Sequence, residues 1–185
     1  MARFLQARQR GHSLLELGMA LVLATLLLSL ALPSLRATFA SVRMDTAKAA
    51  IFGALQFARA SAVARADNVV LCPSRDGRHC SGGLAWQEGF IVFADHDLDE
   101  APGKDTDILR VGGAQEGIAI LATAGRQRLT YRSDGSSAGS NVSLTLCDAR
   151  GSAFARSIVV SNVGRVRMGA PTAAQAAAAC AQLRH

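Results

Sequence analysis

The sequence GHSLLELGMALVLATLLLSLALP, residues 11–33, contains the longest apolar run of the chain and decides how the chain is organised. Its uncharged part, Leu17–Leu32, approaches the roughly 18–20 residues that a membrane span needs, and no second run does so. The residues before it carry positive charge without any acid, at Arg3, Arg8 and Arg10. Such a pattern predicts a cytoplasmic N-terminus and an exported remainder.

Two ordinary interpretations of this run compete, a cleaved secretory signal and a plain membrane anchor. A secretory signal needs a small-x-small cleavage site soon after the apolar region, and no Ala-x-Ala occurs between Ala24 and Ala47. A plain anchor explains the run but not Glu16, because a carboxylate in hydrocarbon costs about 2.5–3.5 kcal/mol on insertion scales. Glu16 therefore needs either a place near the membrane interface or a partner for its charge.

The composition of the whole chain fits one domain with an added apolar segment. The 185 residues are 50% hydrophobic and include 35 alanines, which argues against a disordered chain. The single apolar run argues against a polytopic membrane protein. The net charge of +6 permits a polyanionic partner without requiring one. We find no phosphate loop, no GxSxG and no HExxH, so we expect neither an enzyme nor a cofactor or small-molecule substrate.

The segment after the apolar run is typical of an amphipathic helix. Apolar residues recur in steps of three and four on one face, at Met44, Ala47, Ile51, Leu55, Ala58 and Ala62. We predict one long helix over about residues 13–66, kinked near Pro33. Its first half is apolar on all sides, which suits lipid or a filament core, and its second half would pack on a globular domain.

After Asn68 the hydrophobic period changes to that of short strands separated by Gly, Asp, Asn and Ser. The runs are 69–71, 90–93, 108–111, 118–121, 129–131, 142–146 and 157–160. The fold class is therefore α+β, a long N-terminal helix packed on a small antiparallel β domain. We expect five segments: 1–11, 12–35 and 36–67 (the two halves of the helix), 68–169 (the β domain) and the alanine-rich tail 170–185, in which a helix after Pro171 remains open.

The stretch Gly11-His12-Ser13-Leu14-Leu15-Glu16, followed by the apolar run and Pro33, resembles the prepilin signal of type IV pilins and pseudopilins. The resemblance implies that 1–11 is a leader, that a prepilin peptidase cuts after Gly11, and that the new N-terminal residue, His12, is methylated. Glu16 then stands fifth in the mature chain, as the family pattern requires. His12 departs from that pattern, where phenylalanine is usual. In a stack of subunits, Glu16 of one could neutralise the α-amine of a neighbour.

Motifs of the β part are similar to the GspH/FimT family of minor pseudopilins. They are Leu71-Cys72-Pro73-Ser74, the run from Trp86 to Asp95, Leu146-Cys147-Asp148 and Val163-Gly164-Arg165-Val166-Arg167. The FimT branch fits better, which implies a type IV pilus accessory subunit. Such a subunit would be a single-pass protein of the bacterial inner membrane with a periplasmic domain, assembling with other pilins. A GspH-like pseudopilin of a type II secretion system is the alternative.

Arginines gather in the C-terminal part, where residues 108–185 hold nine arginines against three acids. If 165–167 is a strand, Arg165 and Arg167 share one face, and two guanidinium groups side by side suit phosphate oxygens. Positive charge on an edge strand also prevents aggregation, so a purely structural role is the competing interpretation. The FimT resemblance implies that Gly164, Arg165 and Arg167 bind duplex DNA without sequence preference during DNA uptake.

The four cysteines, Cys72, Cys80, Cys147 and Cys180, predict disulfides in an exported domain. Cys72–Cys80 would close a short loop and Cys147–Cys180 would pin the tail, although other pairings remain open. A zinc site using Cys72, His79 and Cys80 lacks the spacing of known zinc motifs, and we predict no metal there. The acidic segment 88–107 includes Asp95-x-Asp97-x-Asp99, which is not an EF-hand, so a different calcium loop or a solvated turn remains open.

Overall fold

A computed structural model describes residues 13–103, 107–137 and 139–183 of the chain. Its first element is the helix α1, Leu14–Arg65, which continues through position 33 without interruption over 52 residues. By length and composition α1 is able to cross a membrane, and no other helix among the described residues is. The chain forms two compact units, with the boundary between Phe39 and Ala40. The helix bounds agree with the prediction of 13–66, whereas the kink at Pro33 stays a prediction.

The second half of α1 buries one face, as its periodicity predicts. All six residues of the predicted stripe, from Met44 to Ala62, are buried, and Ala54 joins them. Burial of this face begins at Met44, since the side chains described between Leu14 and Phe39 are exposed. The hydrophobic effect on this one face holds the helix in the globular unit.

In the described part of the chain, eight antiparallel strands form two four-stranded sheets. The first sheet has the order β3-β2-β1-β5, made of β1 (Val69–Pro73), β2 (Phe90–Ala94), β3 (Ile108–Gly112) and β5 (Leu129–Tyr131). The second has the order β4-β6-β7-β8, made of β4 (Ile118–Ala122), β6 (Val142–Asp148), β7 (Arg156–Val160) and β8 (Val166–Gly169). Each of the seven predicted runs lies in one of β1–β7, and β8 is the strand that carries Arg167.

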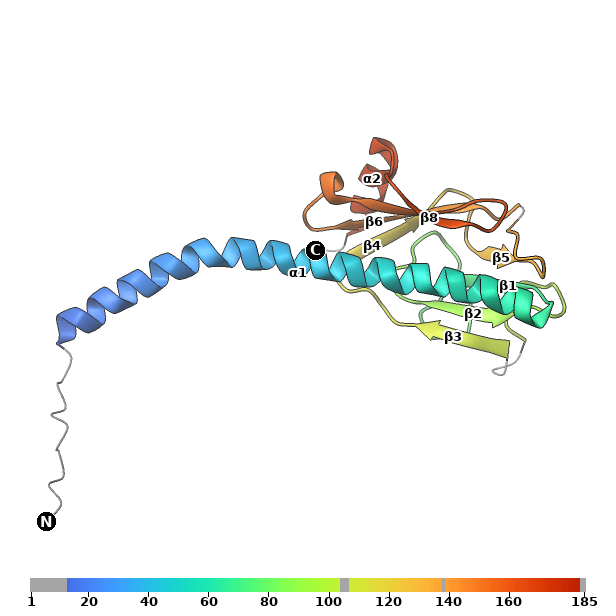
Figure 1. Cartoon of the computed structure of the whole chain (residues 1–185), viewed down its shortest axis with the longest axis horizontal. Helices are drawn as coiled ribbons and strands as arrows, with labels where there is room; N and C mark the ends of the chain where they lie inside the picture. Colours follow the sequence, from blue (N-terminus) through green and yellow to red (C-terminus); the bar gives the residue numbers. More distant parts are fainter. Residues whose placement is uncertain (1–12, 104–106, 138, 184–185) are drawn as a thin grey trace, which may run out of the picture. The chain divides into compact units, whose positions relative to one another are not determined.

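The main core lies between α1 and both sheets, as Figure 1 shows for the globular unit. Apolar residues at alternate positions of the strands fill it, among them Leu71, Val92, Leu144 and Ile158, together with Trp86. A smaller cluster on the other face of the first sheet contains Val70, Cys72, Ile91 and Phe93, with Cys80 packed against it. Both faces of β1 and β2 are therefore buried, which explains why these strands read as continuous apolar runs.

Two disulfides close loops on the β part, Cys72–Cys80 and Cys147–Cys180. The second joins β6 to the helix α2, Ala173–Cys180, which forms from the alanine-rich tail. Thr172 begins α2 with a capping box, since its hydroxyl accepts from the backbone N–H of Gln175 and the Gln175 side chain accepts from the N–H of Thr172. Contacts of α2 with β6 and β4 place it on the second sheet, on the face away from the core.

Candidate functional site

The Gly164-Arg165-Val166-Arg167 motif forms the turn from β7 into β8 and the start of β8. The backbone N–H of Gly164 donates to the carbonyl of Ser161, and the N–H of Ser161 donates to the carbonyl of Arg165, at 2.7 and 3.1 Å. Arg165 and Arg167 are exposed while Val166 between them is buried. The motif therefore has the alternation of a strand, with both guanidinium groups on its solvent side.

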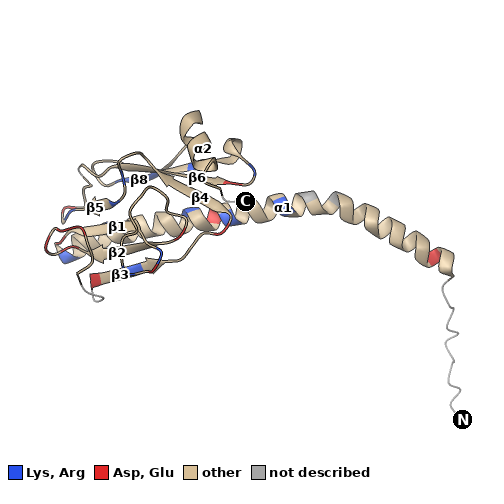
Figure 2. Cartoon of the chain, turned by 180° about the vertical axis from the view of Figure 1, so that it is seen from behind, with Lys and Arg blue, Asp and Glu red and all other residues tan. Residues whose placement is uncertain are grey.

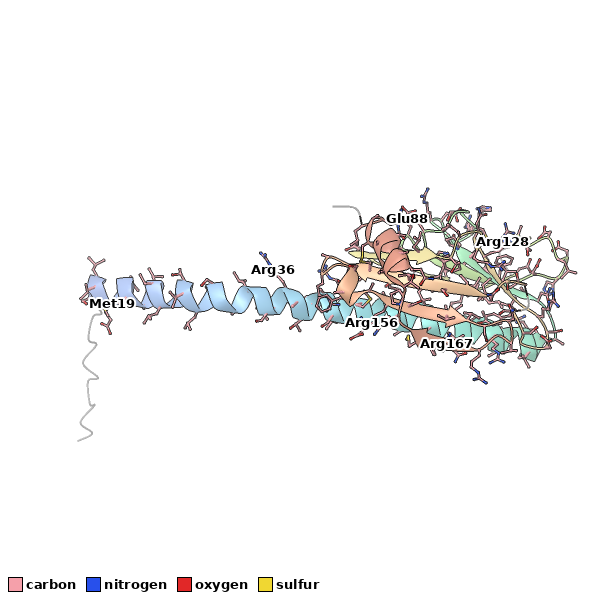
Figure 3. All side chains as sticks on the ribbon, turned by 90° about the horizontal axis from the view of Figure 1, so that it is seen from above. Met19, Arg36, Glu88, Arg128, Arg156 and Arg167 are labelled. Carbon is pink, nitrogen blue, oxygen red and sulfur yellow. A yellow bond between two sulfur atoms is a disulfide. The ribbon has the colours of Figure 1, made fainter. Side chains whose placement is uncertain are left out.

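The two arginines of the motif are available to a ligand. Neither side chain makes a hydrogen bond or an ion pair with residues in the described part of the chain. Figure 3 shows the Arg167 side chain pointing away from the ribbon, and Figure 2 shows basic residues on β8. Two exposed, permanently charged forks, one just before the edge strand β8 and one within it, can bind phosphate oxygens through charge-assisted hydrogen bonds.

Within the motif, Gly164 allows the backbone conformation of the turn. Its φ of +76° lies in the left-handed region, and a Cβ at this position would overlap the carbonyl oxygen of Gly135. The turn at 161–165 thus lies directly on the loop that follows β5. Ser137 of that loop also donates through its backbone N–H to the Asn162 carbonyl and through its hydroxyl to the Ser161 carbonyl. Only glycine permits this close approach of two backbones.

Arg59 of α1 forms hydrogen bonds with both of these segments, the loop after β5 and the turn before β8. Its Nε donates to the Gly135 carbonyl at 3.0 Å and its Nη2 to the Val163 carbonyl at 3.3 Å. The sequence gives Arg59 no signal beyond its position off the apolar stripe, so its role emerges only from the contact of residues far apart in the chain. Burial raises the pKa of the neighbouring Tyr131 hydroxyl far above its usual range, and the Arg59 charge opposes that shift.

At the other end of the chain, Glu16 lies in the first turn of α1 and is the acidic residue of that turn (Figure 2). Ser13 caps the helix, because its hydroxyl accepts from the backbone N–H of Glu16 at 3.2 Å. The spacing Ser13-x-x-Glu16 matches a capping pattern that sequence reasoning missed. Gly11 and His12, the predicted processing site, lie outside the described residues. The Glu16 carboxylate is exposed, next to exposed Leu14 and Leu15.

The cysteines and the acidic segment complete the predicted site residues. Because all four cysteines are in disulfides, Cys72 and Cys80 have no thiolates with which to bind zinc. Asp95, Asp97 and Asp99 bring carboxylate oxygens within 4.8 Å of one another. Burial raises the pKa of Asp95, and its Oδ1 accepts from the backbone N–H of Glu100 at 3.1 Å. A calcium loop here stays a prediction.

A solved minor pilin structure agrees with this architecture. No curated protein matches the sequence. The fold is similar to that of the type IV minor pilin FimU of Pseudomonas aeruginosa in two crystal forms, each with TM-score 0.55 and 17% identity, covering 74% and 76% of this chain and 98% of FimU. The minor pseudopilin EpsH from the type 2 secretion system of Vibrio cholerae matches with TM-score 0.48 and 12% identity, over 69% of this chain and 96% of EpsH.

A family model extends the agreement from fold to sequence. The model of the type II transport protein GspH matches residues 48–164, which is well over half of the chain. The match covers the buried half of α1 from Lys48 onward, strands β1–β7 and the turn as far as Gly164. The chain therefore belongs to the GspH family.

Proposed function

We propose that the protein is a minor pilin-like subunit of a type IV pilus, anchored in the inner membrane by the first half of α1. One observation carries this proposal: in a member of the GspH family, a single 52-residue helix has an apolar, exposed first half and a second half that is the core of a β domain. The first half needs lipid or neighbouring helices around it, because its apolar side chains are exposed on every side. The second half carries the folded domain.

The proposal includes processing after Gly11 by a prepilin peptidase and methylation of His12. The mature chain would then begin two residues before Leu14, the first residue of α1, and place a new α-amine near the helix start. In the filament, that amine would meet the Glu16 carboxylate of a neighbouring subunit. Pairing of the two charges inside an apolar bundle offsets the cost of placing either one there.

Assembly is tested with Glu16→Ala in a strain that makes pili. We expect the variant to be membrane-inserted and cleaved but to be depleted from sheared pili, because the charge pair that favours the neighbour is lost. Leu15→Ala is the matched control, since it alters the adjacent residue without removing a charge. Normal amounts of the Glu16→Ala subunit in sheared pili would refute the assembly role, and an uncleaved wild-type chain by mass spectrometry would refute processing.

We further propose that the pilus-borne domain binds duplex DNA through Arg165 and Arg167, as a receptor in natural transformation. The support is their exposure at the start of the edge strand β8 and the turn that Gly164 allows. Contacts to phosphate alone carry no sequence information, so binding is sequence-independent and falls steeply with salt. Replacing both arginines by alanine should lower the affinity and reduce the slope of log K against log[salt] by about 2. An unchanged slope would refute the direct contact.

The family model favours a second function, a pseudopilin of a type II secretion system, since it describes a type II transport protein. A deletion strain scored in parallel for twitching, protein secretion and DNA uptake separates the candidates. Loss of twitching or uptake with normal secretion supports the pilus. Loss of secretion alone supports the alternative.

A further inference from the structure

The strand register of the second sheet places a row of side chains on the face away from α1. Ser143 of β6 lies opposite Val159 of β7, and Val159 lies opposite Arg167 of β8. Their neighbours along the strands, Leu144 and Ile158, are in the core, so this row points outward. Arg167 is thus two strand spacings, about 10 Å, from Ser143 across the outer face.

A hollow of about 380 Å³ lies on this outer face, at the ends of β6 and β7. Its floor includes Ser143 and Val159, and its walls include Arg126, Asn141 and, from α2, Gln175. Arg126 is its charged lining residue, and none of the described residues that line it is an acid. Because Val159 pairs with Arg167, β8 borders the hollow on the side away from β6. The hollow therefore has a positively charged residue on two sides, Arg126 on one and Arg167 on the other.

Arg126 is held in a defined orientation at the wall of the hollow. Its Nη1 donates to the carbonyl of Gly139 at 2.6 Å and its Nη2 donates to Oδ1 of Asn141 at 3.2 Å. A guanidinium group has five N–H donors, so these two bonds leave three for a ligand. The side chain is half-buried, which lowers the entropy lost when it binds a further oxygen.

We propose that Arg126 is a third phosphate-binding residue and that the DNA backbone crosses the hollow between Arg126 and the pair Arg165 and Arg167. This inference rests on the proposed binding of DNA and adds to it a residue and a face. The ligand chemistry is that of phosphodiester oxygens, because the site offers arginine forks and few aromatic side chains for stacking. The face is the one opposite α1, so the bound DNA does not contact the helix.

The test uses the full chain in a neutral detergent and a fluorescein-labelled duplex of mixed sequence, with affinity measured by anisotropy at several salt concentrations. Arg126→Gln should lower the affinity roughly three- to tenfold and reduce the salt slope by about 0.9, the value of one lost phosphate contact. Arg126→Lys loses the forked pair of bonds to Gly139 and Asn141 but keeps the charge, and should keep the wild-type slope. If Arg126 only held its loop in place, Arg126→Gln and Arg126→Lys would have the same salt slope.

Arg110→Gln is the matched control. Arg110 is an exposed arginine of β3 on the other sheet, over the ring of Phe57, and its replacement changes the net charge equally. The salt slope of Arg110→Gln should equal that of the wild type. If the wild type binds with a steep slope and Arg126→Gln keeps that slope, or Arg110→Gln lowers it as much, the inference is overturned while the proposed function stands. If the wild type does not bind the duplex, the proposed DNA binding itself fails, and the inference fails with it.

Discussion

The two halves of α1 are made of similar aliphatic residues but have opposite environments. Leu27 in the first half is 65% exposed, whereas Leu55 in the second half is fully buried. The first half is apolar on all sides, and the second half is apolar along one stripe. The comparison teaches that the pattern, rather than the amount, of apolar surface decides whether a helix finds its partners inside its own chain or outside it.

Identical substitutions in the two halves test this difference most directly. Leu55→Ala should lower the free energy of unfolding of the globular unit by about 2–5 kcal/mol, because a buried cavity replaces the side chain. Leu27→Ala should change it by less than about 0.5 kcal/mol. Urea denaturation of the detergent-solubilised chain, followed by Trp86 fluorescence, measures both. Equal destabilisation by the two variants would break the comparison.

The globular unit contains two disulfides, whereas the first half of α1 contains none, because the four cysteines of the chain all follow residue 71. Loss of either disulfide by paired Cys→Ala replacement should cost about 2–4 kcal/mol of unfolding free energy. Loss of the Cys147–Cys180 bond should cost about 1 kcal/mol more than loss of Cys72–Cys80, because it spans 33 residues instead of 8. Denaturation of the two paired variants checks the order, which a larger loss for the short loop would contradict.

Three Gly→Ala replacements, two in the globular unit and one in the first half of α1, compare the cost of adding a Cβ in different surroundings. Gly164→Ala should cost about 1–3 kcal/mol for its left-handed backbone and more for the overlap with Gly135. Gly125→Ala, with a similar φ of +78° but open space around it, isolates the backbone part at about 1 kcal/mol. Gly18→Ala in the first half of α1 has open space and helical geometry and should not destabilise. Thermal unfolding of the three variants is the measurement.

A smaller effect is expected at Asp95, a buried carboxylate of the globular unit. Its folded-state pKa is raised above the unfolded value, so the folded state holds its proton more tightly and gains stability as the pH falls through the folded pKa. Asp95→Asn keeps an oxygen for the Glu100 N–H and should therefore raise the melting temperature slightly at pH 7 in chelator. It should also flatten the acid side of the pH profile. A fall in melting temperature in chelator would contradict this account of Asp95.

Local chemistry made much of the architecture predictable. The stripe from Met44 to Ala62 fixed the buried helix face, and the change of period after Asn68 located the strands, because both depend on neighbours in sequence. The contacts of Arg59 with Gly135 and Val163 were not predictable, since they join residues 76 and 104 positions apart. The two-sheet order and the hollow beside Arg126 depend on the same long-range packing.

The bond from Cys147 to Cys180 makes the end of the chain a closed ring that contains β7, β8 and the turn between them. Val163 at the tip of that turn is 65% exposed, so it is an open target for a protease. A single cut there would leave the two pieces joined through sulfur, migrating as one species until a reductant separates them. The ring thus keeps Arg165 and Arg167 attached to the subunit even after the peptide chain beside them is cut.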